Sequence, residues 1–144
     1  MDRELTLLCS TCGQGIVQDD GYLWVSRHEA NTVQQAYKAF EERNTDPADG
    51  SLAFDLTDIS ALPAPAVWQA DHSECDPERD KDSHYRIPAA RLRLRADLLD
   101  WSAHLAEKPW LPHTDWRDVM RETRTGSTRI AISGPRPPAY PAAF

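Results

Sequence analysis

The chain has 144 residues, of which 40% are hydrophobic and 27% charged, and this length is enough for one domain with a sizeable core. No apolar run approaches the ~20 residues of a membrane helix, and the first ten residues carry acidic side chains where a signal peptide would have an apolar core. We therefore predict a cytoplasmic protein and not a membrane or secreted one. The net charge of −7 also disfavours nucleic acid as the main partner.

The first elements predicted along the chain are short strands. Residues 4–8 are expected to form a strand that leads into the sequence Cys9-Ser-Thr-Cys12-Gly13. Residues 16–17 and 22–25 flank an Asp-Asp-Gly sequence at 19–21, which is typical of a hairpin turn. These patterns predict a small antiparallel sheet with the cysteine-containing turn at its edge.

A helix is predicted next. Asn31 or Thr32 can cap its start, residues 33, 36, 37 and 40 are apolar at helical spacing, and Asn44-Thr45-Asp46-Pro47 ends it. Residues 52–56 then alternate like a strand, and the prolines at 63 and 65 indicate a loop. After this loop, Trp68 is expected to pack over His72 and Cys75, which are candidate metal ligands.

Two more helices are predicted in the second half of the chain. The first extends from about Ala96 to Lys108 and stops at Pro109, because proline cannot continue a helix. The second begins after Thr114, whose side chain can cap it. Aromatic residues at helical spacing are more often core residues than a ligand cage. We therefore expect these apolar side chains to be buried: Leu98, Trp101, Leu105, Trp110, Trp116, Val119 and Met120.

The most specific signal in the sequence is a pair of metal-ligand motifs, Cys9-x-x-Cys12 and His72-x-x-Cys75. A two-residue gap lets a tight turn point both sulfur atoms to one side, and Gly13 can adopt the positive φ that closes such a turn. Zinc prefers four ligands in a tetrahedron, so the second pair would complete a structural Zn²⁺ site. All three cysteines are then used, and His84 is the alternative ligand if His72 does not reach the ion.

The predicted fold class is α+β, with a small antiparallel zinc-ribbon-like sheet, an inserted helix and two C-terminal helices. Residues 1–124 are expected to form a single zinc-stabilised domain. Residues 125–144 are expected to form a proline-rich segment that is extended or disordered, with a short strand at 129–132.

Two resemblances accompany these motifs. The cysteine-containing turn, together with the second ligand pair, resembles zinc-ribbon folds over about the first 26 residues. The stretch from Ala96 to Trp110, the sequence Thr114-Asp-Trp116 and the sequence His72-Ser-Glu-Cys75-Asp76-Pro77 resemble a group of short actinobacterial and mobile-element proteins without an assigned activity. This second resemblance implies a compact zinc-containing protein with an accessory or regulatory role.

We interpret the chain as a non-enzymatic, zinc-stabilised binding or regulatory module whose partner is a protein. One alternative is a nucleic-acid-binding accessory protein that uses the basic run from Arg86 to Arg95. The acidic loop from Asp76 to Asp82 can instead neutralise these arginines, which makes the nucleic-acid role less favoured.

A second alternative is a metal-dependent hydrolase or nuclease. Asp71-His72 beside a Cys-x-x-Cys is similar to HNH nucleases, but those need a downstream asparagine and histidine, and Asn31 and Asn44 both lie upstream. A redox role for Cys9 and Cys12 would need a βαβ context, which the hairpin-like sequence does not offer.

Overall fold

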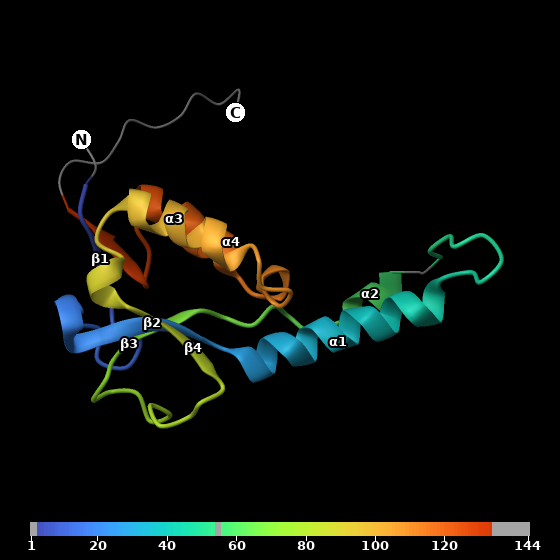
Figure 1. Cartoon of the computed structure of the whole chain (residues 1–144), viewed down its shortest axis with the longest axis horizontal. Helices are drawn as coiled ribbons and strands as arrows, with labels where there is room; N and C mark the ends of the chain where they lie inside the picture. The colour runs from blue at the N-terminus through green and yellow to red at the C-terminus, as the bar shows by residue number, and fades with distance from the viewer. Residues whose placement is uncertain (1–2, 54–55, 134–144) are drawn as a thin grey trace.

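The computed structural model describes residues 3–53 and 56–133 of the chain (Figure 1). Within these residues the protein combines helices with two small antiparallel sheets, which confirms the predicted α+β class. None of the helices in this part of the chain is both long enough and apolar enough to cross a membrane.

The larger sheet has three antiparallel strands in the order β3-β2-β4. The central strand β2 (Gly21–Ser26) pairs with β3 (Gln69–His72) on one side and with β4 (His84–Pro88) on the other. Leu23 and Val25 of β2 are fully buried. Gly21 is required where β2 meets β3, because a Cβ atom there would lie 2.3 Å from the backbone oxygen of Asp71.

The predicted hairpin between residues 16–17 and 22–25 is wrong. Residues 16–17 belong to no strand, and a short 3₁₀ helix, η1 (Gln18–Asp20), connects them to β2. The N–H of Ile16 donates to the carbonyl oxygen of Leu7 at 2.8 Å, so this segment is already bonded to the strand at residues 5–7. Because β2 is buried, it needs a neighbour on each side, and two sequence-distant strands provide them.

The second sheet joins the two ends of the described chain. Strand β1 (Leu5–Leu7) pairs antiparallel with β5 (Ile130–Ile132), which confirms the strands predicted near these positions. Residues up to 133 are therefore part of the packed structure, whereas residues 134–144 of the predicted tail lie outside the described residues.

The longest helix, α1 (Arg27–Asn44), follows β2 without a loop, and its outer half projects away from the sheets, α3 and α4 (Figure 1). The predicted start at Asn31 or Thr32 is wrong, because the hydroxyl of Ser26 accepts the N–H of Glu29 at 3.2 Å and caps the helix earlier. The predicted end at Asn44 is confirmed.

The strand predicted at residues 52–56 does not form at the positions described. Leu52 makes only an isolated bridge with Thr45, and the short helix α2 (Leu56–Ser60) begins at the end of this stretch. Phe54 and Asp55 lie outside the described residues. The turn at residues 46–50 aligns only Thr45 with Leu52. A strand needs several consecutive residues paired with a neighbour.

Helices α3 (Arg95–Leu105) and α4 (Trp116–Thr125) confirm that two helices form in the second half, although α3 ends at Leu105, before the predicted end at Lys108. The carboxylate of Asp97 accepts the backbone N–H groups of Arg93 and Leu94, which caps the start of α3. The indole N–H of Trp116 donates to Oγ of Ser102 at 2.8 Å and joins the two helices. The helices contribute these side chains to the buried core: Leu98, Leu105, Trp116 and Val119.

Aromatic side chains fill the space between the larger sheet and the helices. Trp68 is fully buried, and its ring centroid lies 5.0 Å from that of Trp116 and 6.3 Å from that of Trp110. Its indole N–H donates to Oγ1 of Thr114 at 3.0 Å. Trp68 thus packs in an aromatic core, whereas we expected it to cover the candidate ligands. The core positions predicted for Trp110 and Trp116 are confirmed, while Trp101 and Met120 are only half-buried.

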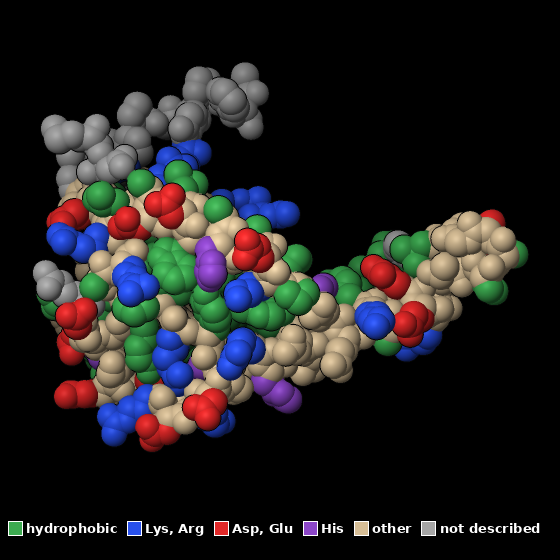
Figure 2. Space-filling model, viewed as in Figure 1, with side chains coloured by type: hydrophobic (Ala, Val, Ile, Leu, Met, Phe, Trp, Pro, Cys, Tyr) green, Lys and Arg blue, Asp and Glu red, His purple; other side chains and the backbone are tan. Residues whose placement is uncertain are grey.

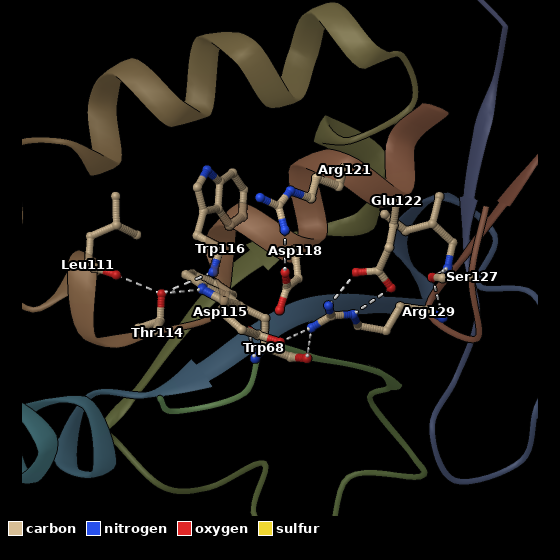
Figure 3. Close-up of polar contacts among 11 residues, drawn as sticks. Trp68, Leu111, Thr114, Asp115, Trp116, Asp118, Arg121, Glu122, Ser127 and Arg129 are labelled. Atoms are coloured by element: carbon tan, nitrogen blue, oxygen red, sulfur yellow. Dashed lines mark hydrogen bonds and ion pairs between the residues drawn. The ribbon is translucent and has the colours of Figure 1, made fainter. Parts of the chain in front are cut away.

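A network of charged groups joins β5 to α4 (Figure 3). Arg129 donates to Oδ2 of Asp115 at 2.6 Å, to the carboxylate of Glu122, and to the backbone oxygen of Trp68 at 2.9 Å. The three charged side chains are only 13% to 19% exposed. Each charge has a partner, so the network fixes α4 against Trp68, the residue that precedes β3.

We predict that Arg129→Met destabilises the protein by about 3–5 kcal/mol, because two largely buried carboxylates lose their cation. The matched control is Arg121→Met. The Arg121 side chain is 72% exposed, and its 3.6 Å ion pair with Asp118 should contribute at most about 1 kcal/mol. Urea unfolding monitored by circular dichroism measures both variants, and equal losses would contradict the role assigned to Arg129.

Candidate metal centre

The turn that carries Cys9 and Cys12 follows β1 almost directly. It closes through a hydrogen bond from the N–H of Gly13 to the carbonyl oxygen of Cys9, at 2.8 Å. Gly13 has a φ of +78°, in the left-handed region that glycine adopts at little cost. A further bond from the N–H of Cys9 to the carbonyl oxygen of Gln14, at 2.9 Å, folds the turn back on itself. This is the local geometry expected of a Cys-x-x-Cys-Gly sequence.

The second candidate pair lies where β3 ends. His72 is the last residue of this strand, and its carbonyl oxygen accepts the N–H of Cys75 at 2.9 Å, which returns Cys75 toward the histidine. The first turn is held against β3 by a bond from the N–H of Ser10 to the carbonyl oxygen of Ala70, at 2.7 Å. Two segments that are distant in the sequence therefore meet at this end of the sheet.

The ligand atoms of Cys9, Cys12, His72 and Cys75 all lie within 4.8 Å of one another. The Nδ1 atom of His72 is 3.3 Å from the sulfur of Cys12 and 3.9 Å from the sulfur of Cys75. In a tetrahedral site with Zn–S near 2.3 Å and Zn–N near 2.0 Å, neighbouring ligand atoms are roughly 3.5–3.8 Å apart. The spacing of the four side chains is consistent with a bound metal ion such as zinc.

Hydrogen bonding orients the ring of His72 as a metal ligand. Its Nε2 lies 3.1 Å from the carbonyl oxygen of Gly15, which can only accept, so we assign the ring proton to Nε2. Nδ1 then keeps its lone pair on the side of the cysteines. The carboxylate of Asp20 lies 3.7 Å from Nε2 and further favours a proton there.

Asp71 connects the two candidate pairs, although it is not one of the clustered ligands. Its side chain is buried, and its carboxylate accepts hydrogen bonds from the hydroxyls of Ser10 (3.0 Å) and Thr11 (2.8 Å), the two residues between the cysteines. It also accepts the indole N–H of Trp24 at 2.8 Å. Sequence reasoning considered Asp71 only as a nuclease residue. The hydroxyl pair between the cysteines was a signal for this role, but it does not reveal which carboxylate the hydroxyls contact.

The thiols differ in their proton affinity. Burial raises the pKa of Cys9, but hydrogen bonds from the backbone N–H groups of Cys12, His72 and Thr11 outweigh it and lower that pKa to about 7. Burial and hydrogen bonds with the other two thiols raise the pKa of Cys75 to about 12. The protein thus stabilises the thiolate of Cys9, whereas it does not stabilise a second thiolate beside it at Cys75. A bound cation would resolve this conflict by holding all three groups as thiolates.

The other candidates from the sequence lie outside this cluster. The ring of His84, proposed as an alternative ligand, stacks on Trp24 with a centroid separation of 4.2 Å, and its Nε2 lies 3.2 Å from Oε2 of Glu78. Arg86, the first arginine of the basic run, donates to the backbone oxygens of Glu78 and Arg79. The acidic loop therefore binds both residues, and His84 does not replace His72.

In comparisons with known proteins, no protein-family model, curated protein or solved structure matches the chain. The resemblance to short actinobacterial and mobile-element proteins therefore stays a prediction. The fold and the site together define a small α+β protein with a Cys₃His cluster suited to metal binding.

We predict that Asp71→Ala lowers the free energy of unfolding by about 3 kcal/mol or more, because three donors around the first turn lose a buried, charged acceptor. Asp80→Ala is the matched control, since Asp80 is exposed in the loop that follows the site. Denaturant titrations of the two variants in one buffer give the difference. If both variants unfold at the wild-type midpoint, Asp71 does not fix the turn.

Proposed function

We propose that Cys9, Cys12, His72 and Cys75 bind one structural zinc ion, and that the protein is a non-enzymatic binding or regulatory module built around it. The observation that carries this proposal is the convergence of three sulfur atoms and one imidazole nitrogen within 4.8 Å. Sulfur and imidazole ligands suit zinc, whereas magnesium and calcium prefer oxygen ligands.

The number of ligands favours a structural role over a catalytic one. A catalytic zinc usually keeps three protein ligands and leaves a position for water or substrate. Here a fourth ligand, Cys75, is on hand to close the coordination shell. A nuclease would also need Asp71 or a comparable group free to act, and the carboxylate of Asp71 is engaged by its hydrogen-bond donors.

The ion would join three pieces of the fold: the turn after β1, the end of β3, and the turn that contains Cys75. Structural zinc contributes roughly 10–16 kcal/mol of apparent binding energy at neutral pH, while a whole domain is stable by only about 5–15 kcal/mol. A protein with this site would therefore depend on the metal for its folded state.

We propose that the binding partner is another protein. Two of the arginines considered for nucleic-acid binding already have partners: Arg86 lies over the ring of Tyr22 and bonds the acidic loop, and Arg93 pairs with Glu4 at 2.6 Å. Of the basic run, this leaves Arg91 and Arg95 for phosphate contacts. The negative net charge also disfavours binding to nucleic acid.

We expect the purified protein to contain one zinc ion per chain by elemental analysis. Its cobalt-substituted form should show sulfur-to-cobalt charge transfer and the intense visible bands of a tetrahedral site. His72→Gln should keep charge transfer from the three remaining thiolates but shift the visible bands, and it should bind zinc about 100-fold more weakly. His28→Gln, at the exposed start of α1, is the matched control and should keep both properties.

The same samples test whether the metal is structural. Chelation should lower the melting temperature by more than about 15 °C, because each kcal/mol corresponds to roughly 3 °C for a chain of this size. A zinc content far below one per chain after reconstitution under reducing conditions, or a tetrahedral cobalt spectrum that survives replacement of both Cys12 and Cys75 by serine, would refute the proposal.

A further inference from the structure

Residues 27–53 and 56–62, which include α1 and α2, form an arm that projects from the body of the protein (Figures 1 and 2). Val33 and Phe40 of α1 are buried, at 5% exposure each. The outer part of the arm nevertheless presents apolar side chains to solvent: Leu52 is 48% exposed, Leu56 83% and Ile59 41%. Apolar residues that gather on a projecting element indicate an interaction surface.

A cleft of about 510 Å³ opens near the base of the arm, where η3 (Leu111–His113) leads into α4. The second half of α1 is held beside it, because the rings of Tyr37 and His113 lie 5.4 Å apart. The lining of the cleft combines apolar, cationic and acidic side chains: Pro65, Leu111, Pro112, Trp116, Arg117, Arg121, Asp115 and Asp118. Figure 3 shows Trp116 beside Arg121 and Asp118 in this region. An apolar floor with a charged rim is typical of a site that binds a protein segment.

The charges of the arm and of the cleft are complementary. The outer part of the arm is net acidic, because it carries the exposed acids Glu41, Glu42, Asp46 and Asp49 against the exposed bases Lys38 and Arg43. In the cleft, Asp118 pairs with Arg121, and Asp115 is occupied by Arg129. Arg117 forms no ion pair within residues 3–53 and 56–133, so its charge is available to an acidic partner.

The arm cannot reach the cleft of its own chain. Helix α1 has 18 residues and contains neither proline nor glycine, so it has no residue that would let it fold back. At about 1.5 Å per residue it is about 27 Å long, and its outer end points away from the body (Figure 1). A contact between the arm and this cleft would therefore have to join two molecules.

We propose that the arm docks into the cleft of a second copy of this chain and forms a twofold-symmetric dimer. In this dimer the two arms lie antiparallel, and the outer end of each arm reaches the cleft at the base of the other. The two copies have the same structure, so a twofold axis that places one arm in the partner's cleft also places the partner's arm in the first cleft. This inference concerns a surface remote from the cysteines and does not rest on the proposed zinc site.

Sedimentation velocity on the full chain tests the proposal, with micromolar dimerisation as the expected result. Leu56→Asp on the arm and Arg117→Glu in the cleft should each raise the dimer dissociation constant at least about tenfold. The matched control is Leu99→Asp, because Leu99 is an apolar residue of α3 that is 54% exposed on the body. It should leave the dissociation constant unchanged, and circular dichroism should show that all three variants are folded.

Cross-linking distinguishes this dimer from any other. A photoreactive phenylalanine analogue in place of Leu56 of a ¹⁵N-labelled chain, mixed with unlabelled protein, should attach to an unlabelled peptide that contains residues 111–117. A wild-type protein that stays monomeric at several hundred micromolar, whether alone or while it binds a different protein, overturns the proposal. Adducts confined to one chain, or a dimer that tolerates both Leu56→Asp and Arg117→Glu, overturn it as well.

Discussion

The structure depends on the contact between the turn that follows β1 and the end of β3. Cys12 and His72, which meet there, are separated by 60 residues in the sequence. Closing a loop of this length costs conformational entropy, although the cost grows only slowly with length. The Asp71 carboxylate offsets part of it by accepting the Ser10 and Thr11 hydroxyls. A zinc ion at the four clustered side chains would join the same two segments.

Strand β2 links this contact to the rest of the protein, because its two faces have different surroundings. Leu23 and Val25 face the hydrophobic core, which the aromatic side chains around Trp68 complete. Trp24 points to the opposite face, where its indole bonds Asp71 and its ring stacks on His84. Alternation along a single strand thus connects the candidate metal centre to the core.

The candidate metal centre and the arm lie at different parts of the molecule and suit different tasks. The Cys₃His cluster joins short segments that have little secondary structure of their own, which is a task of a structural ion in a small domain. The arm consists of α1, the turn that follows it and α2, and its exposed apolar side chains lie after α1, at Leu52, Leu56 and Ile59. The interaction surface proposed for the arm is therefore separate from the groups that hold the fold.

The sequence by itself determined the features that rest on local patterns. The ligand spacing, the glycine that closes the first turn, and the helical periodicity of α3 and α4 all act over a few residues and could be read directly. The tertiary structure alone decided which strands pair with β2, because an Asp-Gly turn favours a hairpin locally, whereas burial of Leu23 and Val25 requires neighbours on both sides. It also decided the place of Trp68 in the aromatic core and the role of Asp71. Each of these depends on a contact between residues far apart in the chain, and local propensity carries no information about such contacts.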